Sequence, residues 1–239
     1  MREAQIGEDQ ERTEIMAVTV RARLTFIEEI LGTASGNKAL HSEYIASKAP
    51  DAETMEQEIE AIGAERVTEK TMTVFPRNEK GEEILWPYQI KGFFKSAQQT
   101  LNRITKDKKK FPYMTAHKSK IDNLIFVKAT QDSWKRTGTG IVIHYPEGVE
   151  ESYDCERPLR AETAQGPRVA LAHSETCPAG SWIELDIMSR DDDLEYYIHE
   201  WLNSGMFYGI GQWRNADKGR FVWELLDEDG KVIKGGNKD

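Results

Sequence analysis

The feature that most constrains the fold of this chain is an apolar stripe with helical spacing between Pro87 and Ile104. Its apolar residues recur every three or four positions: Ile90, Phe93, Phe94, Ala97, Leu101 and Ile104. This spacing is typical of an amphipathic helix that buries one face. Pro87 suits the first helical turn, whereas Gly92 inside the helix costs roughly 1 kcal/mol relative to alanine. We therefore expect a helix here, with tight packing at Gly92.

Strand patterns lie on both sides of this helix. The segment from Ala17 to Phe26 alternates apolar and polar residues and carries Arg21 and Arg23 on its polar face. Such a period of two predicts a half-buried strand. Further strands are expected at 71–76, 83–86, 123–128, 141–145, 153–162, 166–175, 182–188 and 221–226, the first two as a hairpin.

Two further regions are expected to be helical. Residues 38–64 are acidic and helical in pattern, and 194–202 carries an apolar stripe. The latter helix follows the acidic cap 191–193, and Gly205 suits its C-terminal end. The regular elements reduce to the order β-α-β-β-α-β, which is the ferredoxin-like or RRM-like arrangement. The expected fold class is α+β, with helical and basic-loop insertions.

We expect one domain over residues 16–229. At 239 residues the chain can bury a sizeable core. The polar segment 1–15 is expected to be a disordered leader, and 230–239 a polar tail. Insertions are expected near 38–66 and 104–122.

Composition limits the classes of function. Acidic residues (41) outnumber Lys and Arg (32), giving a formal net charge of −9. This charge argues against a protein that is basic over its whole surface, but not against a local basic groove. No apolar run is long enough for a membrane span and the N-terminus lacks a signal-peptide core, so we expect a soluble cytoplasmic protein.

Cys155 and Cys177 lack metal-binding spacing, and no cofactor or metal is expected. The two thiols could form a disulfide, although free thiols are the simpler expectation in a reducing compartment.

Positive charge is concentrated between Arg103 and Lys120, a segment that we call the basic island. It contains one acid, Asp107. Its cations and interleaved rings are Arg103, Lys106, Lys108, Lys109, Lys110, Phe111, Tyr113, His117, Lys118 and Lys120. Lys and Arg bind phosphates and aromatic rings stack on bases. The island therefore favours a single-stranded nucleic-acid contact, with a solvated loop as the alternative.

A second candidate is the segment Phe207–Phe221, called here the Gly-rich loop. Three glycines fall within eleven residues, interleaved with Trp213, Arg214, Lys218 and Arg220. Glycine lets the backbone approach a partner closely, and such loops can hold phosphates. The alternative is a plain hairpin with its arginines on the surface.

The segments 18–26, 87–95, 168–182 and 209–221 occur in an order that resembles the CRISPR-associated RAMP superfamily. Residues 18–26 are similar to its first strand, and 87–95 to its "sxxKGxxR" helix start, with Lys95 where arginine is usual. Residues 168–182 resemble its "E-x-x-P-x-G" strand pair, and 209–221 its C-terminal "GGxRSxGxGxF" loop. The last segment departs from the pattern at Gln212 and at 215–217.

The resemblance implies an RRM-like fold that binds RNA, often as the repeating backbone subunit of a crRNA-guided complex. As a stand-alone protein of this size, the chain also resembles relatives found in phage and mobile elements. The expected partners are single-stranded RNA, or less readily DNA, and further copies of this chain or other RAMP-like subunits along the strand. Besides the island, the expected nucleic-acid contacts are Arg21, Arg23, Lys91, Lys95, Arg157, Arg160, Arg168, Trp213, Arg214, Lys218 and Arg220.

Catalysis has weaker support. Some RAMP proteins cleave RNA with a histidine, and His117 could serve a 2′-OH attack with lysines stabilising the transition state. A histidine among lysines is more often a binding or surface residue. His199 lacks the second histidine of HExxH. We expect a non-catalytic binder, with two alternatives: an endoribonuclease using His117, or an acidic subunit or inhibitor that docks on a nucleoprotein complex through protein surfaces.

Overall fold

The computed structural model describes residues 18–35, 72–132, 140–163 and 166–236, with side chains of 158–171 excepted. The expected leader 1–15 and the expected helical insertion near 38–66 lie outside these residues.

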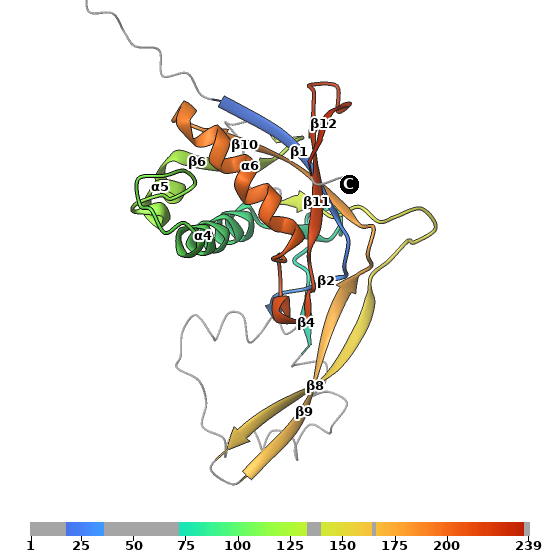
Figure 1. The fold of residues 1–239 in the computed structure, drawn as a ribbon. Helices are drawn as coiled ribbons and strands as arrows, with labels where there is room; N and C mark the ends of the chain where they lie inside the picture. The colour runs from blue at the N-terminus through green and yellow to red at the C-terminus, as the bar shows by residue number, and fades with distance from the viewer. Residues whose placement is uncertain (1–17, 36–71, 133–139, 164–165, 237–239) are drawn as a thin grey trace, which may run out of the picture.

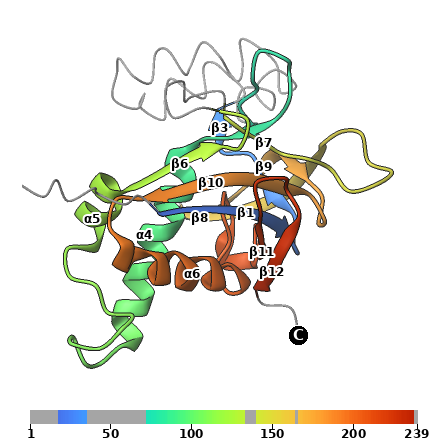
Figure 2. The ribbon, with the colours of Figure 1, turned by 90° about the horizontal axis from the view of Figure 1, so that it is seen from above.

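The chain is an α+β protein built on a five-stranded antiparallel sheet (Figure 1). The strand order is β12-β11-β1-β10-β6. The bounds are β1 (Val18–Phe26), β6 (Ile125–Ala129), β10 (Trp182–Ser189), β11 (Phe221–Leu226) and β12 (Val232–Gly236). Along the chain, α4 (Pro87–Ile104) comes between β1 and β6, and α6 (Glu195–Asn203) between β10 and β11. Both helices lie on the same side of the strands (Figure 2).

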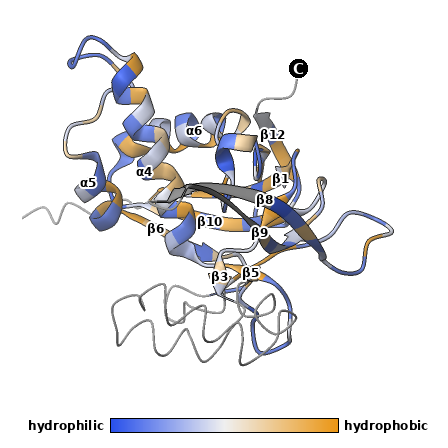
Figure 3. Ribbon diagram, turned by 90° about the horizontal axis from the view of Figure 1, so that it is seen from below, coloured by the Kyte–Doolittle hydropathy of each residue, from blue (hydrophilic) through white to orange (hydrophobic). Residues whose placement is uncertain are grey.

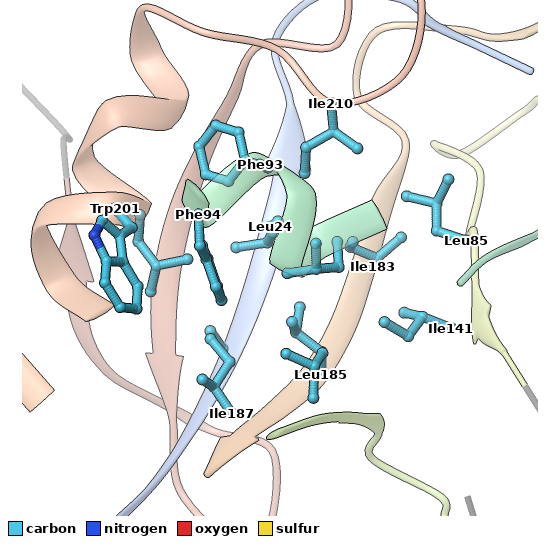
Figure 4. Close-up of a cluster of buried hydrophobic side chains, with 14 of the residues drawn as sticks. Leu24, Leu85, Phe93, Phe94, Ile141, Ile183, Leu185, Ile187, Trp201 and Ile210 are labelled. Atoms are coloured by element: carbon cyan, nitrogen blue, oxygen red, sulfur yellow. The ribbon is translucent and has the colours of Figure 1, made fainter. Parts of the chain in front are cut away.

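The core lies between these helices and the sheet. The alternation of β1 is confirmed, since Val20, Ala22, Leu24 and Phe26 are buried. The apolar stripe of α4 is confirmed as well, with Ile90, Phe93, Phe94 and Ala97 buried. The rings of Phe94 and Trp201 stack at 5.1 Å between centroids, beside Leu24 and Ile187 (Figure 4). One face of α4 is therefore committed to the core.

A second sheet carries a long hairpin that projects from the body (Figure 1). The strands of this sheet are β2 (Ile30–Leu31), β3 (Ala34–Ser35), β4 (Thr73–Val74), β8 (Tyr153–Thr163) and β9 (Gly166–Cys177), and the hairpin is β8 with β9. β8 and β9 pair along their whole length. The remaining elements are β5 (Ile84–Leu85), β7 (Ile141–Val142), α5 (His117–Leu124) and the 3₁₀ helices η1 (Asp192–Leu194), η2 (Ser204–Met206) and η3 (Arg214–Ala216).

Glu175, in the E-x-x-P-x-G segment, joins β9 to the segment that follows β4. Its buried carboxylate accepts hydrogen bonds from the Phe75 backbone N–H (2.7 Å), Arg77 Nη2 (2.5 Å) and Ser152 Oγ (2.8 Å). A buried carboxylate requires such partners. This part of the motif stabilises the scaffold.

Three local expectations are corrected. The expected polar tail contains β12, which pairs with β11 although Val232 and Ile233 are exposed. The expected hairpin of 71–76 with 83–86 is formed only next to its turn, by the Arg77–Glu83 bridge and by a hydrogen bond from the Ile84 N–H to the Pro76 carbonyl at 2.9 Å. Beyond the turn the two strands separate, because β4 pairs with β3 and β9 while β5 pairs with β7.

Gly205 does not end α6 by a left-handed cap, since the helix ends at Asn203 and Gly205 lies in η2. A Cβ at this position would lie 2.4 Å from Phe221 Cε2. Close packing against Phe221 therefore accounts for the glycine.

Cys155 and Cys177 are free thiols, and burial raises the pKa of Cys177 to about 12. In the described ranges, no helix has both the length and the apolar character needed to cross a bilayer.

The sheet face opposite the helices carries an ion-pair network. Arg21 Nε and Nη2 donate to the two carboxylate oxygens of Asp186 at 2.8 and 3.2 Å, and Lys128 Nζ lies 2.5 Å from the same carboxylate. Burial alone would raise the pKa of Asp186, but the hydrogen bonds from Arg21 and Lys128 hold it below its ordinary value. Arg23 pairs with Glu184 at 2.6 Å. Both arginines of β1 are thus engaged within the sheet.

We expect Asp186→Asn to lower the free energy of unfolding by roughly 3 kcal/mol, because buried Lys128 and half-buried Arg21 lose this counter-charge. Urea unfolding at neutral pH measures the loss. Glu184→Gln breaks a more exposed pair and is the control, with an expected loss of about 1 kcal/mol or less. Equal losses in the two variants would contradict this account.

The same network predicts a pH dependence. Because folding lowers the pKa of Asp186, its stabilisation is fully present above the unfolded pKa of about 4. It is lost as the pH falls through the folded pKa. The unfolding free energy of the Asp186→Asn protein should therefore decrease less than that of wild type over this acidic range.

Candidate nucleic-acid interface

The Gly-rich loop closes tightly on itself and on the connection after β1. The Ile210 N–H donates to the Gly219 carbonyl at 3.0 Å, and the Gly219 N–H to the Glu29 carbonyl at 2.7 Å. A Cβ at Gly209 would lie 1.8 Å from the Lys218 carbonyl oxygen. Only glycine permits this approach. The buried side chain of Ile210 joins the core, as expected for a loop that packs on it.

Two cations of the loop are held by carboxylates. Lys218 Nζ lies 2.6 Å from Glu29 Oε2, and Arg220 Nη2 lies 3.1 Å from Glu28 Oε1. The hydrogen bond from Lys218 lowers the pKa of Glu29. Lys218 and Arg220 therefore fasten the loop to the segment between β1 and β2, a role that their positions in the sequence do not reveal.

The loop faces α4 across a groove, called here the α4–loop groove. It consists of two adjoining hollows of about 430 and 600 Å³ that share Ser96, Gly211 and Arg214. Thr33 and Tyr88 line the smaller hollow, and Thr100, Tyr208 and Trp213 the larger. The groove therefore lies on the side of α4 that the core does not use.

The floor of the groove is a stripe of small residues on α4. Gly92, Ser96 and Thr100 follow one another at four-residue spacing and so share a helix face. Nothing lies within 4 Å of a Cβ built at Gly92. The expectation of tight packing at Gly92 is therefore wrong, because this face points to the groove and not to the core. Arg103 continues the stripe and is exposed.

Arg214 is the exposed cation of the groove wall. Among the described residues its side chain has no hydrogen bond, ion pair or ring contact, unlike Arg21, Arg23, Lys218 and Arg220. It follows Trp213, whose φ of 56° is left-handed and rare for a bulky residue.

Aromatic rings accompany this cation. Tyr88 is 69% exposed and Tyr208 37% exposed. The Arg214 guanidinium can bind a phosphate, and the tyrosine rings can stack on unpaired bases. The small residues of the floor leave space for both contacts.

Arg157, another expected contact, is buried beneath the loop. Its side chain lies against Gln212 and Trp213, and it is 6% exposed. The structure thus brings Arg157 to Trp213, the neighbour of Arg214, although Arg157 and the loop are far apart in the sequence.

The basic island runs from the end of α4 to the start of α5, and the turns between them are anchored to the helices. The side-chain amides of Gln98 and Asn102 donate to the carbonyls of Pro112 (2.7 Å) and Met114 (2.9 Å). Phe111 packs on Tyr197 at 5.0 Å between ring centroids. The island's exposed lysines are Lys106, Lys108, Lys109, Lys110 and Lys118, while Lys120 and Tyr113 are half-buried. The turns after α4 are largely hydrophilic (Figure 3).

His117 is poorly placed for catalysis. Its Nε2 is buried without a hydrogen-bond partner, and its Nδ1 lies 3.5 Å from Asn102 Nδ2. Burial, with a smaller contribution from Lys118, lowers its pKa, so the ring is neutral at pH 7. This geometry gives no support to the endoribonuclease alternative.

The other expected contacts lie apart from the groove or outside the described side chains. Lys91 donates to the Asp122 carbonyl at 3.0 Å, and Lys95 pairs with the Asp122 carboxylate at 2.5 Å, so both point towards α5. Desolvation lowers the pKa of Lys91. Arg160 and Arg168 belong to the β8–β9 hairpin, but their side chains are not among those described.

Sequence reasoning missed Tyr88, Ser96, Thr100 and Tyr208 as groove residues. The signal available for α4 was its stripe of small residues at four-residue spacing, on a face distinct from the apolar stripe. Tyr208 carried no comparable signal, because its place in the groove depends on how the loop folds back.

No protein-family model matches this chain, and no curated protein matches its sequence. Among solved structures, it is similar to a chain of the cryo-EM structure of the Type III-B Cmr-beta bound to cognate target RNA, with 11% sequence identity and a TM-score of 0.41. The match covers 92% of this chain and 62% of that chain. At this distance the similarity assigns neither a fold nor a function.

The open environment of Gly92 predicts a stabilising substitution. We expect Gly92→Ala to raise the free energy of unfolding by about 1 kcal/mol, because alanine favours the helix and its methyl group meets no atom. Gly205→Ala is the matched control at a blocked helical glycine, and should destabilise by roughly 1–3 kcal/mol through overpacking against Phe221. Thermal and urea unfolding measure both, and a loss of stability in Gly92→Ala would contradict the open floor.

Proposed function

We propose that this protein binds single-stranded nucleic acid in the α4–loop groove without cleaving it. The observation that carries the proposal is Arg214, an exposed guanidinium that, within the described residues, has no carboxylate partner and lines a groove. Guanidinium groups match phosphate geometry and form charge-assisted hydrogen bonds with it.

The remaining groove residues favour a single strand. Tyr88 and Tyr208 present partly exposed rings, and the faces of bases become available to such rings only when the bases are not stacked in a duplex. The small side chains of Gly92 and Ser96 leave room for a backbone along α4. Arg103 extends the same helix face into the basic island, so the proposed strand continues from Arg214 towards the exposed lysines.

We further propose a ferredoxin-like, RRM-like core of the RAMP type. The order β11-β1-β10-β6, with α4 and α6 as the two connecting helices, supports this arrangement. RNA as the preferred strand, and assembly of several copies along it, follow from the RAMP resemblance. RRM domains stack bases on the open face of their sheet. Here Arg21 and Lys128 are both engaged by Asp186 on that face, which favours the helix side for binding.

Arg214→Gln tests the proposal in titrations of labelled single-stranded RNA and DNA over a series of salt concentrations. Wild-type affinity should fall linearly with salt on logarithmic axes. The variant should bind roughly tenfold more weakly, since it loses a charge-assisted contact of about 1.4 kcal/mol. The magnitude of its salt slope should decrease by about 0.7, the effect of one phosphate contact on a single strand.

Lys231→Gln is the control. This exposed lysine lies beyond the end of β11 that is opposite the Gly-rich loop, so the variant should bind like wild type. If wild type shows no salt-sensitive binding to either nucleic acid, the proposal is wrong and the protein-interaction alternative is favoured.

A further inference from the structure

Arg157 connects the β8–β9 hairpin to the Gly-rich loop. Its Nη1 donates to Ser174 Oγ on β9 at 2.9 Å, and its Nη2 donates to Gln212 Oε1 at 3.0 Å. Its guanidinium carbon lies 5.1 Å from the centre of the Trp213 ring. Ser174 Oγ is itself 2.7 Å from Thr73 Oγ1. The Arg157 side chain thus joins β9 directly to the Gly-rich loop, and Ser174 extends the connection to β4.

The charge of Arg157 has no carboxylate partner in the described part of the chain. Its hydrogen-bond partners are a hydroxyl and an amide, and its Nε is buried without an acceptor. A buried charge is unfavourable unless neighbouring groups compensate it. A planar fork that donates in two directions while lying on an aromatic ring is a property of arginine that neither lysine nor glutamine offers.

The loop conformation next to Arg157 needs such support. Trp213 has a left-handed backbone with φ 56°, and a bulky residue keeps this conformation only when its surroundings hold it. Gln212 and Trp213 immediately precede Arg214. Any loss of order at these two residues would displace the Arg214 guanidinium from the groove wall.

We propose that Arg157 is a positioning residue that holds Gln212 and Trp213 against the β8–β9 hairpin and thereby places Arg214 in the α4–loop groove. This inference rests on the proposed function for its effect on binding. It replaces the expectation of a direct nucleic-acid contact by Arg157, because that side chain is 6% exposed. The groove wall is then coupled to the long hairpin.

The test compares Arg157→Gln and Arg214→Gln in the full-length protein by two measurements. The first is the salt dependence of single-stranded RNA binding. The second is hydrogen–deuterium exchange of residues 207–216 in the protein without nucleic acid. A positioning role predicts that exchange in the loop becomes faster in Arg157→Gln. Binding should weaken roughly tenfold with an unchanged salt slope, because the bound strand re-forms the Arg214 contact and the lost affinity is the cost of ordering the loop. Arg214→Gln should reduce the slope and leave the exchange unchanged.

Gln212→Ala removes the acceptor of the Arg157 Nη2 hydrogen bond and keeps the Arg157 guanidinium buried beneath the loop. It therefore tests the positioning role even if circular dichroism shows that Arg157→Gln does not fold. It should accelerate loop exchange, and the double variant should be no worse than Arg157→Gln alone because the two residues act as one unit. A reduced salt slope in Arg157→Gln with unchanged exchange would overturn the proposal in favour of a direct contact. Unchanged loop exchange in Gln212→Ala would also overturn it.

The exchange measurement needs no ligand, and it therefore separates this inference from the proposed function. If wild type binds no nucleic acid, the proposed function fails. Faster exchange in Arg157→Gln and Gln212→Ala would then still support the positioning of the loop by Arg157.

Discussion

The packing of one face of α4 on the central sheet determines the arrangement of the candidate site. Phe93 and Phe94 commit this face to the core against β1, β10 and α6. Another face packs towards α5 through Lys91 and Lys95, whereas the face with Gly92 and Ser96 is left without bulky side chains. The Gly-rich loop packs beside that face through Ile210. The groove is therefore a consequence of how the core is built.

Ion pairing then divides the cations of this acidic protein into two groups. Arg21, Lys218 and Arg220 contact carboxylates and stabilise the sheet or the loop. Arg214 and five lysines of the basic island, all but Lys120, face solvent. A protein with net charge −9 can attract a polyanion only where positive charge is locally uncompensated, since binding responds to the field at the site. The proposed strand path follows the second group.

Periodicity in the sequence predicted the elements whose burial alternates regularly. β1, α4 and α6 were recovered because each buries one face and exposes another. β12 was missed because Val232 and Ile233 are both exposed, which leaves no alternation. The pairing of β4 with β9 was missed because it joins segments about a hundred residues apart, and local turn signals carry no information on such contacts.

The sequence predicted which residue types form the candidate site, but not which of the cations are exposed in it. The sequence identified Trp213 and Arg214 through the glycine pattern around them. It could not distinguish Arg214 from Arg220, because Glu28, the partner of Arg220, lies 192 positions away. Gly92 was misjudged for a related reason: the sequence indicates a helix interior, but not which helix face meets a groove.

The central claim is that a single strand lies between α4 and the Gly-rich loop. Photo-crosslinking of single-stranded RNA that carries 4-thiouridine, followed by peptide mapping, tests it most directly. The account predicts crosslinks within 88–103 and within 208–215, with further crosslinks in the basic island. Crosslinks confined to the open face of the sheet, on 19–25 and 182–188, would contradict it.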